Sequence, residues 1–122
     1  MSEKSILKEQ LLTYDHFWIK VEHNSPTALV KIGLKEDVIK TIGQIDAFRA
    51  LPKGRCVNRG YPFGSIEHGR KILILRSPIT GSIVEVNEEV IKNPQLINED
   101  PYGKGWIAIL KPSNVEELDA LL

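Results

Sequence analysis

A chain of 122 residues, 42% of them hydrophobic and 26% charged, has the size and composition of one globular domain with a buried core. Its 16 Lys and Arg balance its 16 Asp and Glu, so no net positive charge attracts it to nucleic acid or to an anionic membrane. The single cysteine, Cys56, excludes an intramolecular disulfide. The first residues lack the apolar core of a signal peptide, and no apolar run nears the ~18 residues of a membrane span. We therefore expect a soluble, cytoplasmic protein.

The first quarter of the chain predicts a lead-in followed by a β-hairpin. Residues 1–13 read as a short amphipathic lead-in. Residues 17–22 then alternate with the period of two that is typical of a half-buried strand, and residues 28–33 read as the returning strand. The turn-forming segment 23–26 between them completes the hairpin.

A helix and a series of short strands follow. Residues 35–42 carry apolar side chains at helical spacing, and Gly43 is placed to end the helix. Strand-like segments then recur at residues 45–51, 55–57, 63–67, 72–76, 82–86 and 106–110. Asn87 is suited to cap a short helix, and residues 113–116 have the capping-box pattern that opens a final one. Many short strands with short peripheral helices predict a mostly β protein, a barrel-like sandwich.

The sequence contains no recognisable catalytic or metal-binding motif. The three histidines, His16, His23 and His68, are too far apart for their spacing to indicate a site, and no paired cysteines or phosphate-binding glycine loop is present. We therefore expect no catalytic residues, no metal site and no enzymatic activity. The residue chemistry alone indicates a small β-rich binding module.

Several segments together carry a resemblance to a known family. They are residues 14–18, residues 42–45 with Leu51-Pro52, the glycine, valine and phenylalanine spacing of residues 54–64, and the blocks 77–87 and 93–106. In this order they are similar to the glycine cleavage system H protein, from about residue 12 to the end of the chain. The same blocks contain prolines and glycines that are typical of tight turns, so most of these residues are expected to hold the fold.

The resemblance implies a barrel-sandwich hybrid, the fold of lipoyl and biotinyl carriers, over residues 14–122. In this family a lysine at the tip of a hairpin carries lipoate as an amide. The arm accepts an aminomethyl group at glycine decarboxylase and offers it to an aminomethyltransferase, and dihydrolipoamide dehydrogenase reoxidises it. The resemblance therefore implies a carrier with these proteins and the lipoylation enzymes as partners, and with covalent lipoate as its cofactor.

The hairpin tip departs from the family. The family reads Val-Glu-Ser-Val-Lys-Ala, whereas residues 66–71 here read Ile-Glu-His-Gly-Arg-Lys. Counting three residues onward from Glu67 and seven back from Ser77 both arrive at Arg70, so the lipoyl position holds arginine and Lys71 follows it. The segment after the tip, residues 72–75, is an apolar run that the family pattern lacks, and we expect it to be buried or to cover a partner-facing surface.

The residues at this tip are compatible with two alternative functions of the protein. In one, the covalent arm is absent, and the scaffold is a binding or regulatory module whose recognition tip uses Glu67, Arg70 and Lys71. In the other, Lys71 is lipoylated despite the shift, and the protein is a carrier in glycine cleavage or in a different pathway. The first is the favoured hypothesis, because the arginine side chain stays protonated and has no lone pair for acylation.

Overall fold

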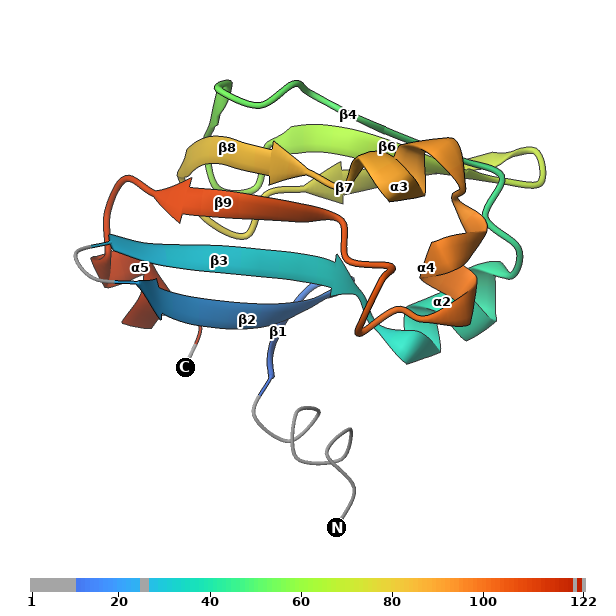
Figure 1. Cartoon of the computed structure of the whole chain (residues 1–122), viewed down its shortest axis with the longest axis horizontal. Helices are drawn as coiled ribbons and strands as arrows, with labels where there is room; N and C mark the ends of the chain where they lie inside the picture. Colours follow the sequence, from blue (N-terminus) through green and yellow to red (C-terminus); the bar gives the residue numbers. More distant parts are fainter. Residues whose placement is uncertain (1–10, 25–26, 120, 122) are drawn as a thin grey trace, which may run out of the picture.

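The computed structural model describes residues 11–24, 27–119 and 121, which form two antiparallel sheets and four short helices (Figure 1). The strands are β1 (Leu12–Tyr14), β2 (Phe17–Asn24), β3 (Thr27–Leu34), β4 (Ala47–Ala50), β5 (Cys56–Val57), β6 (Pro62–His68), β7 (Lys71–Arg76), β8 (Gly81–Val86) and β9 (Ala108–Pro112). The helices are α2 (Glu36–Ile42), α3 (Glu88–Lys92), α4 (Gln95–Glu99) and α5 (Glu116–Asp119). Within these residues one sheet has the order β1-β2-β3-β9-β8-β5 and the other the order β4-β6-β7.

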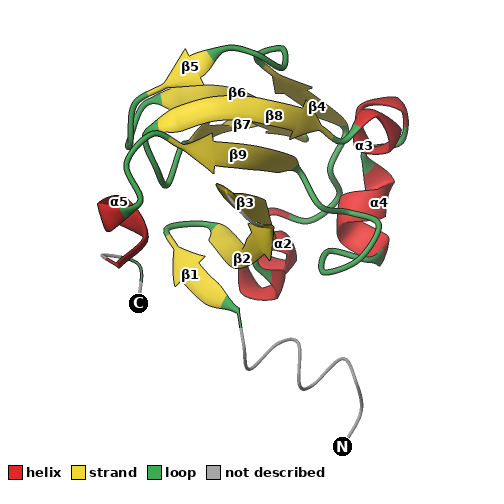
Figure 2. Ribbon diagram, turned by 60° about the vertical axis from the view of Figure 1, so that its left-hand side comes forward, coloured by secondary structure: helices red, strands yellow, loops and turns green. Residues whose placement is uncertain are grey.

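The core lies between the two sheets and is built by strands that alternate inward and outward side chains. Val30, Ile32 and Leu34 of β3 are completely buried, while the intervening Lys31 is partly exposed. Phe17 of β2 and Phe63 of β6 pack with ring centroids 5.9 Å apart, so one aromatic pair joins the two sheets. Figure 2 shows the β4-β6-β7 sheet behind β8 and β9, which makes the barrel-sandwich arrangement visible. The predicted mostly β barrel-sandwich fold is therefore confirmed.

The early elements form where expected, but the start of β2 does not alternate. Phe17, Trp18 and Ile19 are all buried, because the turn after α4 covers the side of β2 that faces away from the core. There the Trp18 indole donates to the Pro101 carbonyl. β2 and β3 form the expected hairpin, with Phe17 paired to Leu34 and Ile19 to Ile32. Helix α2 ends at Gly43, whose φ of 78° lies in the region that glycine adopts readily. Residues 1–10 of the expected lead-in lie outside the described residues, and Leu12–Tyr14 is β1, paired with β2.

Three helix or strand boundaries differ from the sequence expectation, because side chains form hydrogen bonds with the backbone at these positions. The strand expected at residue 45 begins at Ala47, since the Ile45 amide donates to Asn98 Oδ1. The strand expected at residue 106 begins at Ala108, since the Trp106 carbonyl accepts from Asn87 Nδ2. Helix α5 is capped by Asn114, whose Oδ1 accepts from the Glu116 amide, in place of the Ser113 capping box.

The turn block at residues 93–106 ties distant segments together. Asn98 of α4 donates to the Gly43 carbonyl as well as accepting from Ile45, which fixes the end of α2 against the start of β4. The Trp18 indole donates to the Pro101 carbonyl at 3.0 Å in a buried contact. These ties gather α2, α3 and α4 at one end of the sandwich, the end from which the β6–β7 turn extends (Figure 1). No helix among the described residues is long and apolar enough to cross a membrane.

The side chain of Asn87 supplies the first test of this scaffold. It is 5% exposed, accepts from the Glu89 amide at the start of α3, and donates to the carbonyls of Lys104 and Trp106. Substituting Asn87→Ala should lower the free energy of unfolding by about 2–4 kcal/mol, because three hydrogen bonds of one buried side chain are lost together. Asn114→Ala is the matched control, because Asn114 is exposed and makes a single capping bond. Chemical denaturation measures both, and equal losses for the two variants would contradict the role of Asn87.

Candidate functional site at the β6–β7 turn

The β6–β7 hairpin closes through a two-residue turn. His68 pairs with Lys71, so Gly69 and Arg70 are the two residues of the loop. Gly69 has a φ of 64°, whereas Arg70 is not among the residues with positive φ. Glycine with positive φ at the first central position is typical of a type II′ turn, whose twist matches that of the flanking strands. The geometry therefore places Arg70 at the tip of the hairpin and Lys71 at the start of a strand.

An acidic side chain from outside the hairpin holds this turn. Asp46, directly before β4, accepts the Gly69 amide on Oδ2 at 2.8 Å. The Asp46 amide in turn donates to the Glu67 carbonyl at 2.8 Å. The turn is thus bonded to the neighbouring strand on both sides of residue 68, which restricts where the Arg70 side chain can project. Asp46 was not among the residues singled out from the sequence, because it lies 23 positions from Gly69.

The three site residues chosen from the sequence are brought to one region but face different ways. Arg70 is exposed in the loop. Lys71 is exposed at the start of β7 and, by strand alternation, lies on the side of Leu73 and Leu75. Glu67 lies on the other side, where its Oε1 accepts from Arg49 Nη1 at 3.0 Å. Neither Arg70 nor Lys71 forms an ion pair with another residue that the structure describes.

A shallow depression of about 580 Å³ lies beneath the turn. Its lining comes from the end of α2, the segment leading into β4, and the turn itself: Thr41, Ile42, Gln44, Asp46, His68, Gly69, Arg70 and Lys71. His68 is therefore the histidine that belongs to this region. The contributions of Thr41 and Gln44 had no signal in residue spacing, since the two residues lie more than twenty positions before the turn and line the same depression only in the folded chain.

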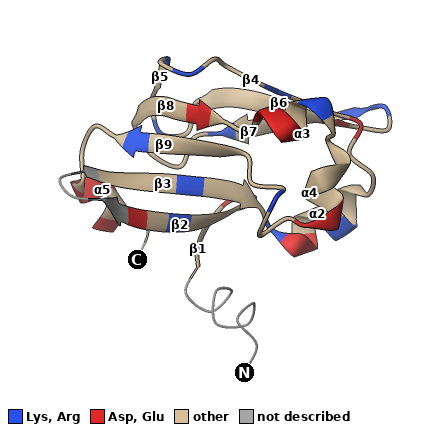
Figure 3. Ribbon diagram, in the orientation of Figure 1, with Lys and Arg blue, Asp and Glu red and all other residues tan. Residues whose placement is uncertain are grey.

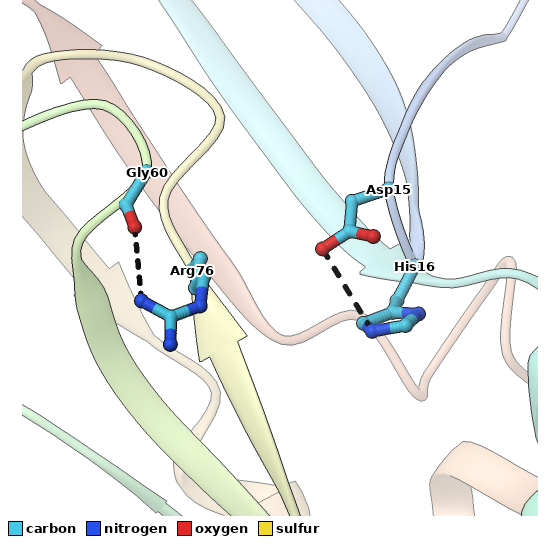
Figure 4. A network of polar contacts seen from close by, with 4 residues as sticks. All are labelled: Asp15, His16, Gly60 and Arg76. Atoms are coloured by element: carbon cyan, nitrogen blue, oxygen red, sulfur yellow. Dashed lines mark hydrogen bonds and ion pairs between the residues drawn. The ribbon is translucent and has the colours of Figure 1, made fainter.

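Two further polar contacts lie away from the tip, one at the end of β7 and one in the turn between β1 and β2 (Figure 4). Arg76 Nη1 donates to the Gly60 carbonyl at 3.2 Å. His16 Nε2 lies 3.7 Å from Asp15 Oδ2 in the turn between β1 and β2. No group of three or more His, Cys, Asp or Glu suited to a metal ion occurs within residues 11–24, 27–119 and 121.

The apolar run after the turn is divided between two faces of β7. Leu75 is completely buried and Leu73 is half-buried, whereas Ile72 and Ile74 are 62% and 42% exposed. The expected burial is therefore confirmed in full for Leu75 only, and burial and exposure alternate along the run, as the pleat of a strand dictates.

A barrel-sandwich with an exposed two-residue hairpin belongs to the class of proteins that carry or present a group at a turn. Comparison with known proteins specifies the family. The family model described as "Glycine cleavage H-protein" matches residues 10–122. A glycine cleavage system H protein of Carboxydothermus hydrogenoformans is 43% identical over 116 residues, covering 94% of this chain and 85% of that protein. A probable glycine cleavage system H protein 2 of Saccharolobus solfataricus is 41% identical over 104 residues, covering 85% and 68%.

A solved structure agrees with these sequence relatives. The crystal structure of a glycine cleavage system H protein from Mycobacterium marinum matches with a TM-score of 0.76 and 30% identity, covering 84% of this chain and 83% of that one. The chain belongs to the glycine cleavage H-protein family, and it has the fold of an H-protein-like carrier. Members of this family are carriers rather than enzymes.

The hydrogen bond between Asp46 and Gly69 predicts that Asp46 positions the tip. Asp46→Ala should remove the acceptor and increase the motion of residues 68–71, with a loss of unfolding free energy of about 0.5–1.5 kcal/mol. Asp46→Asn keeps an acceptor oxygen and is the matched control. Backbone NMR order parameters at Gly69 and Arg70 measure the effect. Unchanged order parameters in Asp46→Ala would show that the turn holds its own shape.

Proposed function

We propose that this protein is an H-protein-like scaffold that works as a binding module in the cytoplasm, with Arg70 where the family's lipoyl lysine stands. The observation that carries the proposal is the register of the hairpin. The pairs Glu67–Ile72 and His68–Lys71 leave a loop of two residues, and Arg70 is the second of them. This register supports the position obtained by counting from Glu67 and from Ser77 in the sequence.

Arginine at this position is incompatible with an amide-linked arm. Lipoate attaches by attack of a neutral amine on an activated acyl group, and the guanidinium stays protonated at any working pH. The residues present at the tip therefore do not fit the covalent group at the family's position. What remains is a hairpin with a rigid, planar cation suited to hydrogen bonds with carboxylates. By the resemblance, the proteins it contacts are glycine decarboxylase, aminomethyltransferase or their relatives.

A carrier modified at Lys71 is the second candidate function. Lys71 is exposed, directly follows the turn and forms no ion pair with other described residues. Its amine is therefore chemically available. Its position opposes attachment, because Lys71 belongs to β7 and lies on the side of Leu73, over the depression beneath the turn. If this chain is lipoylated, we expect Lys71 and no other lysine to be the site.

Restoring the family's lysine tests the proposal. The double substitution Arg70→Lys with Lys71→Ala should raise the rate of modification by a lipoate–protein ligase at least about a hundredfold, because misplacing a reacting group by an ångström costs on that order. Incubation with lipoate and ATP, followed by intact mass measurement, gives the rates. The change should alter the unfolding free energy by less than ~0.5 kcal/mol, since both positions are exposed.

Two further variants separate the alternatives. Lys71→Ala alone should behave as the parent, unmodified, whereas Arg70→Lys alone should gain modification at residue 70. A parent that is fully modified on Lys71, with no gain in the double variant, would refute the proposal and establish the carrier modified at Lys71.

A further inference from the structure

The charge of this chain is strongly divided along its length. Residues 47–84 contain seven basic residues and one acidic residue, Glu67, which gives a formal charge of +6, whereas the whole chain is balanced. The remainder therefore carries a formal charge of −6. All seven basic residues are exposed: Arg49, Lys53, Arg55, Arg59, Arg70, Lys71 and Arg76. Figure 3 shows the acidic segments mainly elsewhere, on α2, α3 and α5 and at the end of β8.

Part of this basic region forms a defined surface, the outer face of the β4-β6-β7 sheet. Phe48, Ile66 and Leu75 point into the core, so their strand neighbours point outward. The cross-strand register places the outward residues beside one another. They are Ala47, Arg49, Ser65, Glu67, Ile72, Ile74 and Arg76. Two exposed isoleucines, Ile72 and Ile74, thus lie on the outer face together with Arg49 and Arg76.

The two isoleucines are the unusual feature of the outer face. They stand at alternate positions of β7, which lies at an edge of its sheet within the described residues. Edge strands usually carry charged side chains at such positions, because an apolar edge invites association. Isolated exposed apolar residues are ordinary, but an adjacent pair with a polar surround has the composition of an interface centre and rim.

The charges identify the kind of partner. The one acid on the outer face, Glu67, is already bonded to Arg49, and directly opposite it stands Ile72. Arg76 and, at the tip, Arg70 form no ion pair with other described residues. An incoming surface must therefore supply the carboxylates and, between them, apolar groups for the isoleucines.

We propose that the outer face of the β4-β6-β7 sheet docks a protein partner that presents Asp and Glu side chains around an apolar patch. This inference rests on the proposed function of a binding module and names its binding surface. A protein fits the outer face better than a nucleic acid, because phosphate groups make no favourable contact with the apolar side chains of Ile72 and Ile74. Binding by complementary charge also makes association fast and dependent on salt.

A peptide of seven residues with two leucines flanked by Asp and Glu is the probe. The same peptide with Lys at every acidic position is the control. Titration into the ¹⁵N-labelled protein, unmodified at the tip, should give saturable amide shifts at residues 47–49, 65–67 and 72–76. The control peptide should give none, and raising the salt concentration should weaken the binding.

Substitutions on the outer face test which of its residues contact the peptide. The pair Ile72→Ser with Ile74→Ser, and separately Arg76→Glu, should each weaken binding at least about fivefold. The matched controls are Val115→Ser, since Val115 is 63% exposed, and Lys111→Glu, since Lys111 is exposed on β9. Both should bind as the parent does, and melting curves confirm that every variant is folded.

Four outcomes would overturn the docking surface. They are no saturable shifts, shifts confined to α2, α3 or α5, equal binding of the basic peptide, or stronger shifts from a short oligothymidylate. Shifts at the same residues that depend on protein concentration alone would assign the outer face to a second copy, which also overturns the proposal. None of these outcomes bears on whether residue 70 can be lipoylated, so the two proposals fail separately.

Discussion

The register between β6 and β7 is the constraint on which the rest of the site depends. Sliding β7 by one residue would turn the buried Leu75 towards solvent and bring Ile72 and Ile74 inward. Burial of the two isoleucines would offset much of the lost leucine burial, so the turn specifies the register: Gly69 has the positive φ of a two-residue loop, and its amide donates to Asp46 Oδ2. With the register fixed and Gly69 in the left-handed region, one residue only, Arg70, occupies the outer position of the loop. The residue at the tip is therefore determined by the pairing of β6 with β7 and by the conformation of Gly69.

The remainder of the scaffold holds this hairpin in place. The Phe17–Phe63 contact joins β6 to the larger sheet, and Asp46 bonds the turn to the start of β4. Asn98 then fixes that start of β4 against α2. A rigid tip suits recognition as well as it suits presentation of an arm, since in both cases little conformational freedom is lost on contact. The same fold is therefore compatible with a binding module and with a carrier.

Local patterns in the sequence predicted much of the fold and only part of the site. The strand-like segments 17–22 and 63–67 and the glycine after α2 are local signals, and β2, β6 and the end of α2 form there. Helix α4 was missed because it has five residues and its N-cap is Pro94, which offers no side-chain hydrogen bond. Asp46, Thr41 and Gln44 were missed because they reach the turn through tertiary packing. The outer face required the cross-strand register, which no single segment contains.

We propose that the tip of this hairpin carries no acyl group, because residue 70 is arginine. Intact mass measurement with peptide mapping, on protein purified from the cells that naturally produce it, tests this most directly. We expect the mass of the unmodified chain, with an unmodified peptide spanning residues 70 and 71. A chain heavier by one lipoyl group, with the group on Lys71, would contradict the proposal.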